Sequence, residues 1–427
     1  MSPGTTVLSW LFVLYHLALR VTFIFWRWIV FILESILRLR LLSYSSHKKR
    51  VIIIGGGHAG TIVASDLEHD FQVTLIDPKN SFEFLPSKLR TLVDPDHANK
   101  VQVRYDQFLR STDIINDSAT SADHNGVVVS GIRYDFDYLV IATGARYVDP
   151  NSIPLLAAKQ IAAENEGDSV KFPSILSARA HNLHHHSHET ERANSIVVIG
   201  GGIVGVELAA ELAETFPRKI ITLVQSGPKL MPRSPDRAIR YTENWFRHQA
   251  VRLILRDRII SRTDRGFETK GGLKIDAQLA FVATGNLPNT EFLCNTTLSR
   301  HVEENGLIRV NSFFQMEGSE NVFAVGDVAA VPNEVEKLSQ SAGKHAQIVA
   351  HNIRAIESKR PLRAYTAKSL PMLISLGKFD GILTYRQFTL TGLLPALMKE
   401  FVEYREMARF WAPSFQHNGK RRHVHVV

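Results

Sequence analysis

The chain has 427 residues, of which 44% are apolar, and its 50 Lys and Arg against 42 Asp and Glu give a net charge of +8. These values predict a globular protein of more than one domain and exclude a disordered or fibrous chain. The single cysteine, Cys294, excludes an intramolecular disulfide framework and a C-x-x-C redox pair, and no basic arm predicts a nucleic-acid partner.

Residues 1–47 are predicted to be a hydrophobic membrane anchor. The stretch 7–42 is dominated by apolar and aromatic residues. Arg20, Arg27 and Glu34 interrupt it at intervals of seven residues, which places them on one stripe of a helix. A helix that spans the bilayer and a helix that lies in its interface both fit this pattern, and a buried helix of a soluble domain is the plainer alternative.

A first glycine-rich turn follows the β-branched strand 50–54 and opens a helix over 61–67. In such a G-x-G-x-x-G turn the first glycine permits the tight turn, the second lets a pyrophosphate approach the backbone, and the third lets helix and strand pack closely. An acidic residue at the end of the next strand accepts hydrogen bonds from a ribose. We therefore predict a dinucleotide site formed by Gly55, Gly56, Gly57, Gly60 and Asp77.

The same order of strand, glycine turn, helix and strand recurs from residue 195, with Gly200, Gly202 and Gly205 in the turn. Here Gln225 stands where the first unit has an acid. A neutral amide neither binds a 2′-hydroxyl strongly nor repels a 2′-phosphate, so this site should discriminate weakly between NADH and NADPH. Lys229 could add attraction for the phosphate, although a plain surface lysine is the simpler interpretation.

The repeat predicts an α/β fold with two Rossmann-like dinucleotide-binding domains. Two strands that end in Ala-Thr-Gly, at 142–144 and 283–285, mark the points where the chain passes between these domains. The predicted domains are a first dinucleotide-binding domain at 48–149 and 286–360, a second at 150–285, and a C-terminal region at 361–427.

Two dinucleotide sites on one chain indicate one fixed and one exchangeable cofactor. We expect FAD in the first site and NAD(P)H, as the exchangeable reductant, in the second. Gly326 and Asp327, after an apolar run, would place a carboxylate near the ribityl chain of the flavin, with a helix at 338–356 behind it. The histidine-rich stretch 181–188 is predicted to be a solvated loop, and no metal site is expected.

The order GGGHAG, ATG, GGGIVGVE, ATG and AVGD resembles that of flavoproteins with two dinucleotide-binding domains, over residues 50–360. The segments 77–90, 337–353 and 371–383 resemble the apoptosis-inducing-factor-like family, which includes membrane-associated NAD(P)H:quinone oxidoreductases, and type II NADH dehydrogenases are more distant. This resemblance implies that Arg90 and Asp327 contact FAD. It also implies that Glu207 lies near the nicotinamide as the catalytic candidate, although a Glu there can simply favour the helix dipole.

Cys294 follows the second Ala-Thr-Gly and matches no catalytic cysteine of disulfide reductases, so the flavin should pass electrons to an external acceptor. The sequence thus predicts a membrane-associated FAD enzyme that reduces a quinone, facing the cytosol on a lipid droplet, the ER or the mitochondrial outer membrane, or else inside mitochondria. Reduction of a protein electron carrier and a redox-controlled interaction protein are the alternatives. An apolar helical face from Leu390 to Trp411, with Lys399, Glu400 and Glu403 off it, would pack on the flavin domain or dock to lipid.

Overall fold

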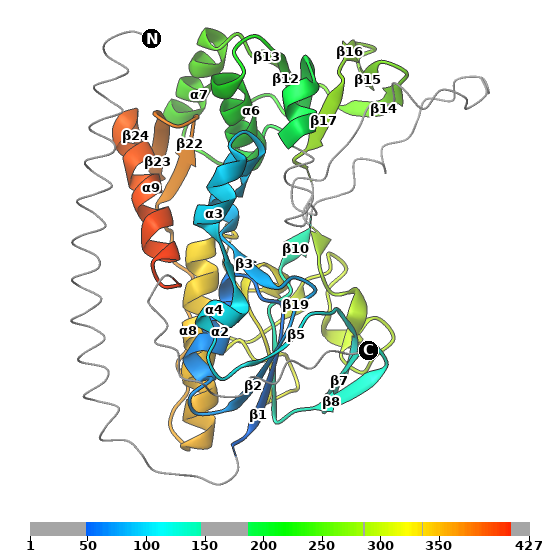
Figure 1. Ribbon diagram of the computed structural model, residues 1–427, viewed down its shortest axis with the longest axis vertical. Helices are drawn as coiled ribbons and strands as arrows, with labels where there is room; N and C mark the ends of the chain where they lie inside the picture. The colour runs from blue at the N-terminus through cyan, green and yellow to red at the C-terminus, as the bar shows by residue number, and fades with distance from the viewer. Residues whose placement is uncertain (1–47, 147–186, 285–286, 335, 411–427) are drawn as a thin grey trace. The chain divides into compact units, whose positions relative to one another are not determined.

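The computed structural model describes residues 48–146, 187–284, 287–334 and 336–410 (Figure 1). The predicted anchor at 1–47, the histidines at 181–186 and Trp411 lie outside these residues. In the part of the chain that is described, no helix combines the length and the apolar character needed to cross a bilayer.

The first glycine turn belongs to a five-stranded parallel sheet with the order β20-β9-β1-β2-β5. These strands are β20 (Val322–Ala324), β9 (Tyr138–Ile141), β1 (Arg50–Ile54), β2 (Gln72–Ile76) and β5 (Asp113–Ile115). The central strand β1 is buried from its second residue onward, as expected for a parallel strand that is covered on both faces. Helices α2 (His58–Leu67) and α8 (Ser339–Glu357) pack against each other beside this sheet (Figure 1).

The second glycine turn belongs to a separate four-stranded parallel sheet with the order β13-β12-β11-β17. These strands are β13 (Arg252–Leu255), β12 (Ile220–Gln225), β11 (Ser195–Ile199) and β17 (Leu279–Val282). Helix α6 (Ile203–Thr215) follows the turn, and helix α7 (Asp236–His248) follows β12. The predicted repeat of strand, glycine turn, helix and strand is therefore confirmed.

The chain pairs with itself just after the two Ala-Thr-Gly segments. Strand β10 (Ala145–Arg146) pairs in antiparallel fashion with β18 (Leu287–Pro288). The Thr143 hydroxyl donates to the Asn289 carbonyl oxygen at 2.8 Å, and the Asn289 amide donates to the Thr143 carbonyl oxygen at 2.9 Å. These bonds tie the two crossings of the chain together.

Strands β19 (Ile308–Arg309) and β21 (Ala329–Ala330) form a short parallel pair. The other remaining strands form small antiparallel sheets and pairs. They are β6 (Ala119–Ala122), β7 (Gly126–Val129) and β8 (Ile132–Asp135); β14 (Ile259–Thr263), β15 (Gly266–Thr269) and β16 (Lys274–Asp276); β22 (Met372–Ser375), β23 (Gly381–Tyr385) and β24 (Phe388–Thr391); and the pair β3 (Ser81–Glu83) and β4 (Gln102–Arg104). The hairpins β22 to β24 carry the last helix, α9 (Leu393–Met407), which contacts β22 and β23.

The prediction of one helical face from Leu390 onward is wrong at its start. Leu390 lies in β24, and α9 begins only after Gly392, whose φ of 102° breaks the backbone pattern. The apolar side chains of α9 are then divided between solvent and core. Leu394 is 56% exposed, whereas Met407 is fully buried. This helix therefore has one end on the surface and the other in the core of the first sheet's domain.

Candidate functional site

The first glycine turn has the shape of a phosphate cradle. Gly55 has a φ of +103°, and a Cβ there would lie 2.4 Å from the Ala142 carbonyl oxygen. A Cβ on Gly60 would lie 1.9 Å from the Gly55 carbonyl oxygen, so helix and strand touch at this point. A Cβ on Gly57 would meet nothing within 4 Å. Gly55 and Gly60 thus make the tight turn. Gly57 leaves open space where a pyrophosphate can approach the helix N-terminus.

Asp77 and Tyr105 hold this turn from the side of the second strand. The Gly56 N–H donates to Asp77 Oδ2 at 2.6 Å, and the Tyr105 hydroxyl donates to the Gly56 carbonyl oxygen at 3.0 Å. Burial, with Asp77 and then Glu83 nearby, raises the pKa of Tyr105 well above its usual value, so its hydroxyl remains a donor. Asp77 therefore lies beside the turn, while its contact with a ribose stays a prediction. No pattern in the sequence indicated Tyr105.

Asp327 lies in the short turn that follows β20. Burial raises the pKa of its carboxyl, and Lys337 and His345 oppose this effect. The Gly326 N–H donates to His345 Nδ1 at 3.4 Å, and His345 Nε2 lies 3.1 Å from Glu334 Oε1. Because Nδ1 accepts, the ring proton belongs on Nε2, where Glu334 receives it. A histidine and a glutamate therefore support the turn that carries Asp327.

The second glycine turn repeats the first. Gly200 has a φ of +116°, a Cβ on Gly205 would lie 1.8 Å from the Gly200 carbonyl oxygen, and a Cβ on Gly202 would meet nothing within 4 Å. Gln225 takes the structural place of Asp77, because its Oε1 accepts the Gly201 N–H at 3.1 Å.

Lys229 lies four residues after Gln225, and its Nζ lies 3.0 Å from Asp236 Oδ1. This contact engages the lysine that was considered for the 2′-phosphate. The ion pair is exposed on both sides, so it holds the ammonium only weakly.

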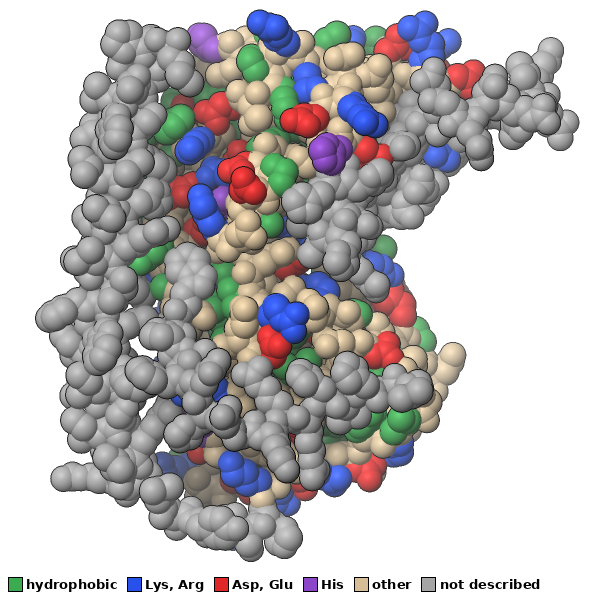
Figure 2. All heavy atoms as spheres, in the orientation of Figure 1, with side chains coloured by type: hydrophobic (Ala, Val, Ile, Leu, Met, Phe, Trp, Pro, Cys, Tyr) green, Lys and Arg blue, Asp and Glu red, His purple; other side chains and the backbone are tan. Residues whose placement is uncertain are grey.

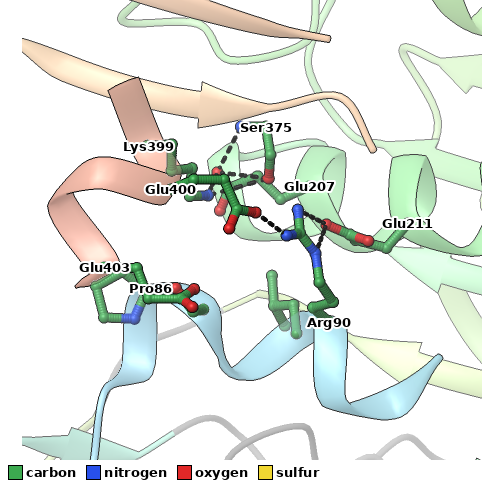
Figure 3. Close-up of a pocket in the computed structure, with 10 residues that line it drawn as sticks. Pro86, Arg90, Glu207, Glu211, Ser375, Lys399, Glu400 and Glu403 are labelled. Atoms are coloured by element: carbon green, nitrogen blue, oxygen red, sulfur yellow. Dashed lines mark hydrogen bonds and ion pairs between the residues drawn. The ribbon is translucent and has the colours of Figure 1, made fainter. Parts of the chain in front are cut away.

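A pocket lies where α6 meets β22, α9 and the 3-10 helix η1 (Leu85–Leu92) (Figure 3). Its walls combine carboxylates with four cationic or hydroxyl side chains. The lining residues are Pro86, Ser87, Leu89, Arg90, Glu207, Glu211, Ser375, Lys399, Glu400 and Glu403. Two residues that were singled out separately from the sequence, Arg90 and Glu207, thus line the same pocket.

Glu207 lies in the first turns of α6 and is buried. Its Oε1 accepts the Ser375 N–H at 2.9 Å and the Ser375 hydroxyl at 3.3 Å, and it forms an ion pair with Lys399 Nζ. Lys399 Nζ also lies 3.0 Å from Ser375 Oγ. The carboxylate of Glu207 is therefore held in one orientation by β22 and α9.

Arg90 bridges three elements in the same pocket. Its Nε and Nη2 donate to Glu211 Oε1 at 3.2 and 3.1 Å, and its Nη1 pairs with Glu400 (Figure 3). Burial disfavours the charged form, but the two carboxylates outweigh burial and raise the pKa of Arg90. The guanidinium therefore stays charged and joins η1 to α6 and α9, while its contact with FAD stays a prediction.

Sequence reasoning missed several residues of this pocket. Lys399 is 192 positions from Glu207. Its place off the apolar face of the predicted helix did not indicate which residue it contacts. Glu211 lies one helical turn after Glu207, and this spacing was the one signal available. In the described residues, no group of three or more potential metal ligands gathers.

Comparison with known proteins now defines the family. The sequence pattern of pyridine nucleotide-disulphide oxidoreductases matches residues 49–348. The chain belongs to this family. As a pyridine nucleotide-disulphide oxidoreductase it is an oxidoreductase whose cofactors are FAD and NAD(P)H, and the two open glycine turns fit both dinucleotides. The disulphide of the family name has no counterpart here, since the chain has one cysteine.

The resemblance to apoptosis-inducing-factor-like proteins is confirmed. The chain is 31% identical to apoptosis-inducing factor homolog B of Dictyostelium discoideum, over 79% of this chain and 90% of that protein. It is 28% identical to ferroptosis suppressor protein 1 of Homo sapiens, over 84% of this chain and 94% of that protein.

Several solved structures share the fold of this chain. The sulfide:quinone oxidoreductase of Aquifex aeolicus matches with a TM-score of 0.68 and 21% identity, over 86% of this chain and 93% of that one. NDH2 of Plasmodium falciparum, in complex with NADH, matches with a TM-score of 0.67 and 14% identity, over 85% of this chain and 98% of that one.

Proposed function

We propose that this oxidoreductase takes hydride from NAD(P)H and reduces a quinone at a membrane surface. The FAD domain would comprise residues 48–149 and 286–360, and the NAD(P)H domain residues 150–285. FAD supplies the chemistry when bound, since it accepts a hydride from the nicotinamide and passes two electrons on. Similar proteins support this proposal. The relatives include ferroptosis suppressor protein 1, and one solved structure with the same fold is a sulfide:quinone oxidoreductase.

The observation that carries the quinone proposal is the two-sided character of α9. Its inner side lines the polar pocket with Lys399 and Glu400. Its outer side exposes Leu393, Leu394, Met398 and Phe401, and Phe388 of β24 is 58% exposed as well. One helix therefore connects an apolar surface with the pocket that holds Glu207. An acceptor dissolved in lipid would find its entrance there.

The exposed side chains of α9 also support membrane docking. Moving one Leu or Phe side chain from water into an apolar phase is worth roughly 1.5–3 kcal/mol, so two of them suffice for a measurable change in vesicle binding. Residues 1–47 would provide a second attachment, which stays a prediction. Among the described residues on the face drawn in Figure 2, basic and acidic side chains are interspersed and form no continuous basic stripe for a polyanion.

In the pocket we assign each residue a role. Glu207 would contact the nicotinamide, and Lys399 and Ser375 would position its carboxylate through the bonds to Oε1. Reduction of a quinone by two electrons consumes two protons. The side chains of Lys399 and Ser375 both donate to Glu207 and would deliver protons to an acceptor at the pocket.

The test is anaerobic reduction of the purified enzyme by NADH, followed by mixing with a ubiquinone analogue, menadione, ferredoxin, cytochrome c or oxygen. We expect the quinones to reoxidise the flavin faster than oxygen and the protein carriers. Quinone rates no higher than the oxygen rate would refute the proposal, and a faster reaction with ferredoxin would favour a protein acceptor.

Two sets of variants separate the roles. Glu207→Gln should slow flavin reduction by NADH at least tenfold while FAD stays bound, because the amide loses the charge that Lys399 pairs with. The double variant Leu394→Glu, Phe401→Glu should lose flotation with liposomes. Ile132→Glu is the matched control, since Ile132 is a 46% exposed apolar residue on β8, away from α9 in the chain. Equal loss of flotation in the control would contradict docking through α9.

A further inference from the structure

His58 stands out because the proposed function gives it no role. It is the first residue of α2 and directly follows Gly57, the open glycine of the FAD cradle. Its Nδ1 is buried, and no described residue gives this atom a hydrogen bond. Such an atom costs about 1–3 kcal/mol when it stays unpaired. Nδ1 is bonded to Cγ, so it remains near the backbone of the first turn of α2, where an anion is expected.

The packing around the ring restricts where it can go. The rings of Phe82 and Phe84 lie 6.1 and 6.2 Å away, between centroids. A Cβ at Gly343 of α8 would lie 3.3 Å from Nε2, so α8 also packs against the ring. The imidazole therefore lies between several elements, and little of its side chain is exposed.

The charged groups that face His58 come from α9 and from the turn that follows it. Glu406 Oε2 lies 3.9 Å from Nε2, Arg409 Nη1 lies 3.5 Å from the same oxygen, and Arg405 Nη2 lies 2.7 Å from Glu406 Oε1. The neighbouring residues of β3 and α8 present phenyl rings and a glycine. Burial lowers the pKa of His58 to about 4; Glu406 opposes this shift, and Arg409 and Arg405 add to it. The ring is therefore neutral at neutral pH before a cofactor binds.

We propose that His58 binds the FAD pyrophosphate through Nδ1 as an imidazolium, with Glu406 as its counter-ion at Nε2, so that FAD binding takes up one proton from solvent. A phosphate oxygen requires a donor at Nδ1. In a neutral ring with its proton on Nδ1, the lone pair of Nε2 would face the Glu406 carboxylate, which is unfavourable. A doubly protonated ring donates on both sides, and its charge lies between two anions. The proton is the only species transferred.

The direction of the pH dependence follows from linkage. The pKa of His58 is higher in the FAD complex than the value of about 4 without FAD. Between these two pKa values the complex holds more protons than the apoprotein. FAD affinity therefore increases as pH falls through the bound-state pKa, by up to about tenfold per pH unit, and levels off once both forms are protonated.

Calorimetry of FAD binding to the apoprotein, in buffers that differ in ionisation enthalpy, measures this proton directly. At slightly acidic pH the wild type should take up close to one proton per FAD. His58→Gln, which can donate a hydrogen bond but does not titrate, should take up none, and Glu406→Gln should take up less than the wild type. The control His248→Gln changes an exposed histidine of α7 and should leave the uptake unchanged. No uptake in the wild type, or equal uptake in His58→Gln, would overturn the proposal.

A second measurement uses the holoenzyme and does not require the apoprotein to refold. The ³¹P resonances of bound FAD should shift with pH across the neutral range in the wild type, because the imidazolium next to the pyrophosphate loses its proton. They should not shift in His58→Gln. Flat ³¹P resonances in the wild type contradict the assignment. Neither measurement involves a quinone, so a negative result here leaves the proposed acceptor untouched.

Discussion

Gln225→Glu is the most direct test of how the second glycine turn selects its coenzyme. In the structure Gln225 Oε1 accepts the Gly201 N–H at 3.1 Å, as Asp77 does for Gly56 in the first turn. A glutamate has the same length and can keep this bond. The substitution therefore adds one negative charge, with little change of shape, where we expect the ribose of the coenzyme to bind.

The size of the effect follows from the charge. Two unit charges about 5 Å apart interact by about 3 kcal/mol at an effective dielectric of 20, and by less where water enters. Gln225 is half-buried, so we expect a repulsion of about 2 kcal/mol between the carboxylate and the 2′-phosphate of NADPH. This value corresponds to a loss of about 30-fold in kcat/KM for NADPH. NADH should be unaffected or should gain a few-fold, since a carboxylate binds the 2′-hydroxyl better than an amide does.

The assay is steady-state kcat/KM for both coenzymes with one quinone, in the wild type, in Gln225→Glu and in Lys229→Met. Lys229 is exposed, and an exposed lysine contributes little to binding a charge, so its removal should change the NADPH value only about twofold. Equal changes for NADH and NADPH in Gln225→Glu would refute the reasoning. A large loss for NADPH in Lys229→Met would mean that Lys229 binds the phosphate.

Three further predictions concern the pocket and the first turn. Lys399→Met leaves the buried Glu207 without its cation, so it should lower the free energy of unfolding by about 3–5 kcal/mol in chemical denaturation and slow flavin reduction. Tyr105→Phe removes the hydroxyl that donates to the first glycine turn. Loss of this hydrogen bond costs about 1 kcal/mol, so the variant should bind FAD roughly fivefold more weakly, measured as FAD release on dilution. Burial tends to raise the pKa of Glu403, but the hydrogen bond to His97 lowers this pKa below the ordinary 4.5. The ionised carboxylate therefore stabilises the fold above pH 4.5, and this contribution is lost as the pH falls through the lowered pKa. Glu403→Gln should therefore be less stable than the wild type at neutral pH, and the difference should shrink in acid denaturation.

The local features of the fold could be read from the sequence because they depend on neighbouring residues. Glycine spacing fixed both turns, and the structure shows Gly57 and Gly202 open as that spacing requires. Runs of β-branched residues predicted β1 and β11, which are buried central strands. Each of these signals lies within a few residues of the feature that it predicts.

The pocket could not be predicted in the same way, because its contacts join distant segments. Arg90 meets Glu400 across 310 positions, and neither residue has a pattern that names the other. The helical spacing of apolar residues also continues across Gly392 into β24. The predicted helix therefore begins at Leu390, whereas α9 begins at Leu393. Only the docking of α9 against α6 and η1 decides which of its polar residues face inward.

The most direct test of the central claim is the reoxidation rate of the NADH-reduced flavin on liposomes that contain ubiquinone, measured by anaerobic stopped-flow absorbance. Reduction of a membrane quinone predicts rapid reoxidation that depends on the quinone content of the liposomes and slows in the double variant Leu394→Glu, Phe401→Glu. A rate that is independent of quinone content and equal to the rate with oxygen alone would contradict it.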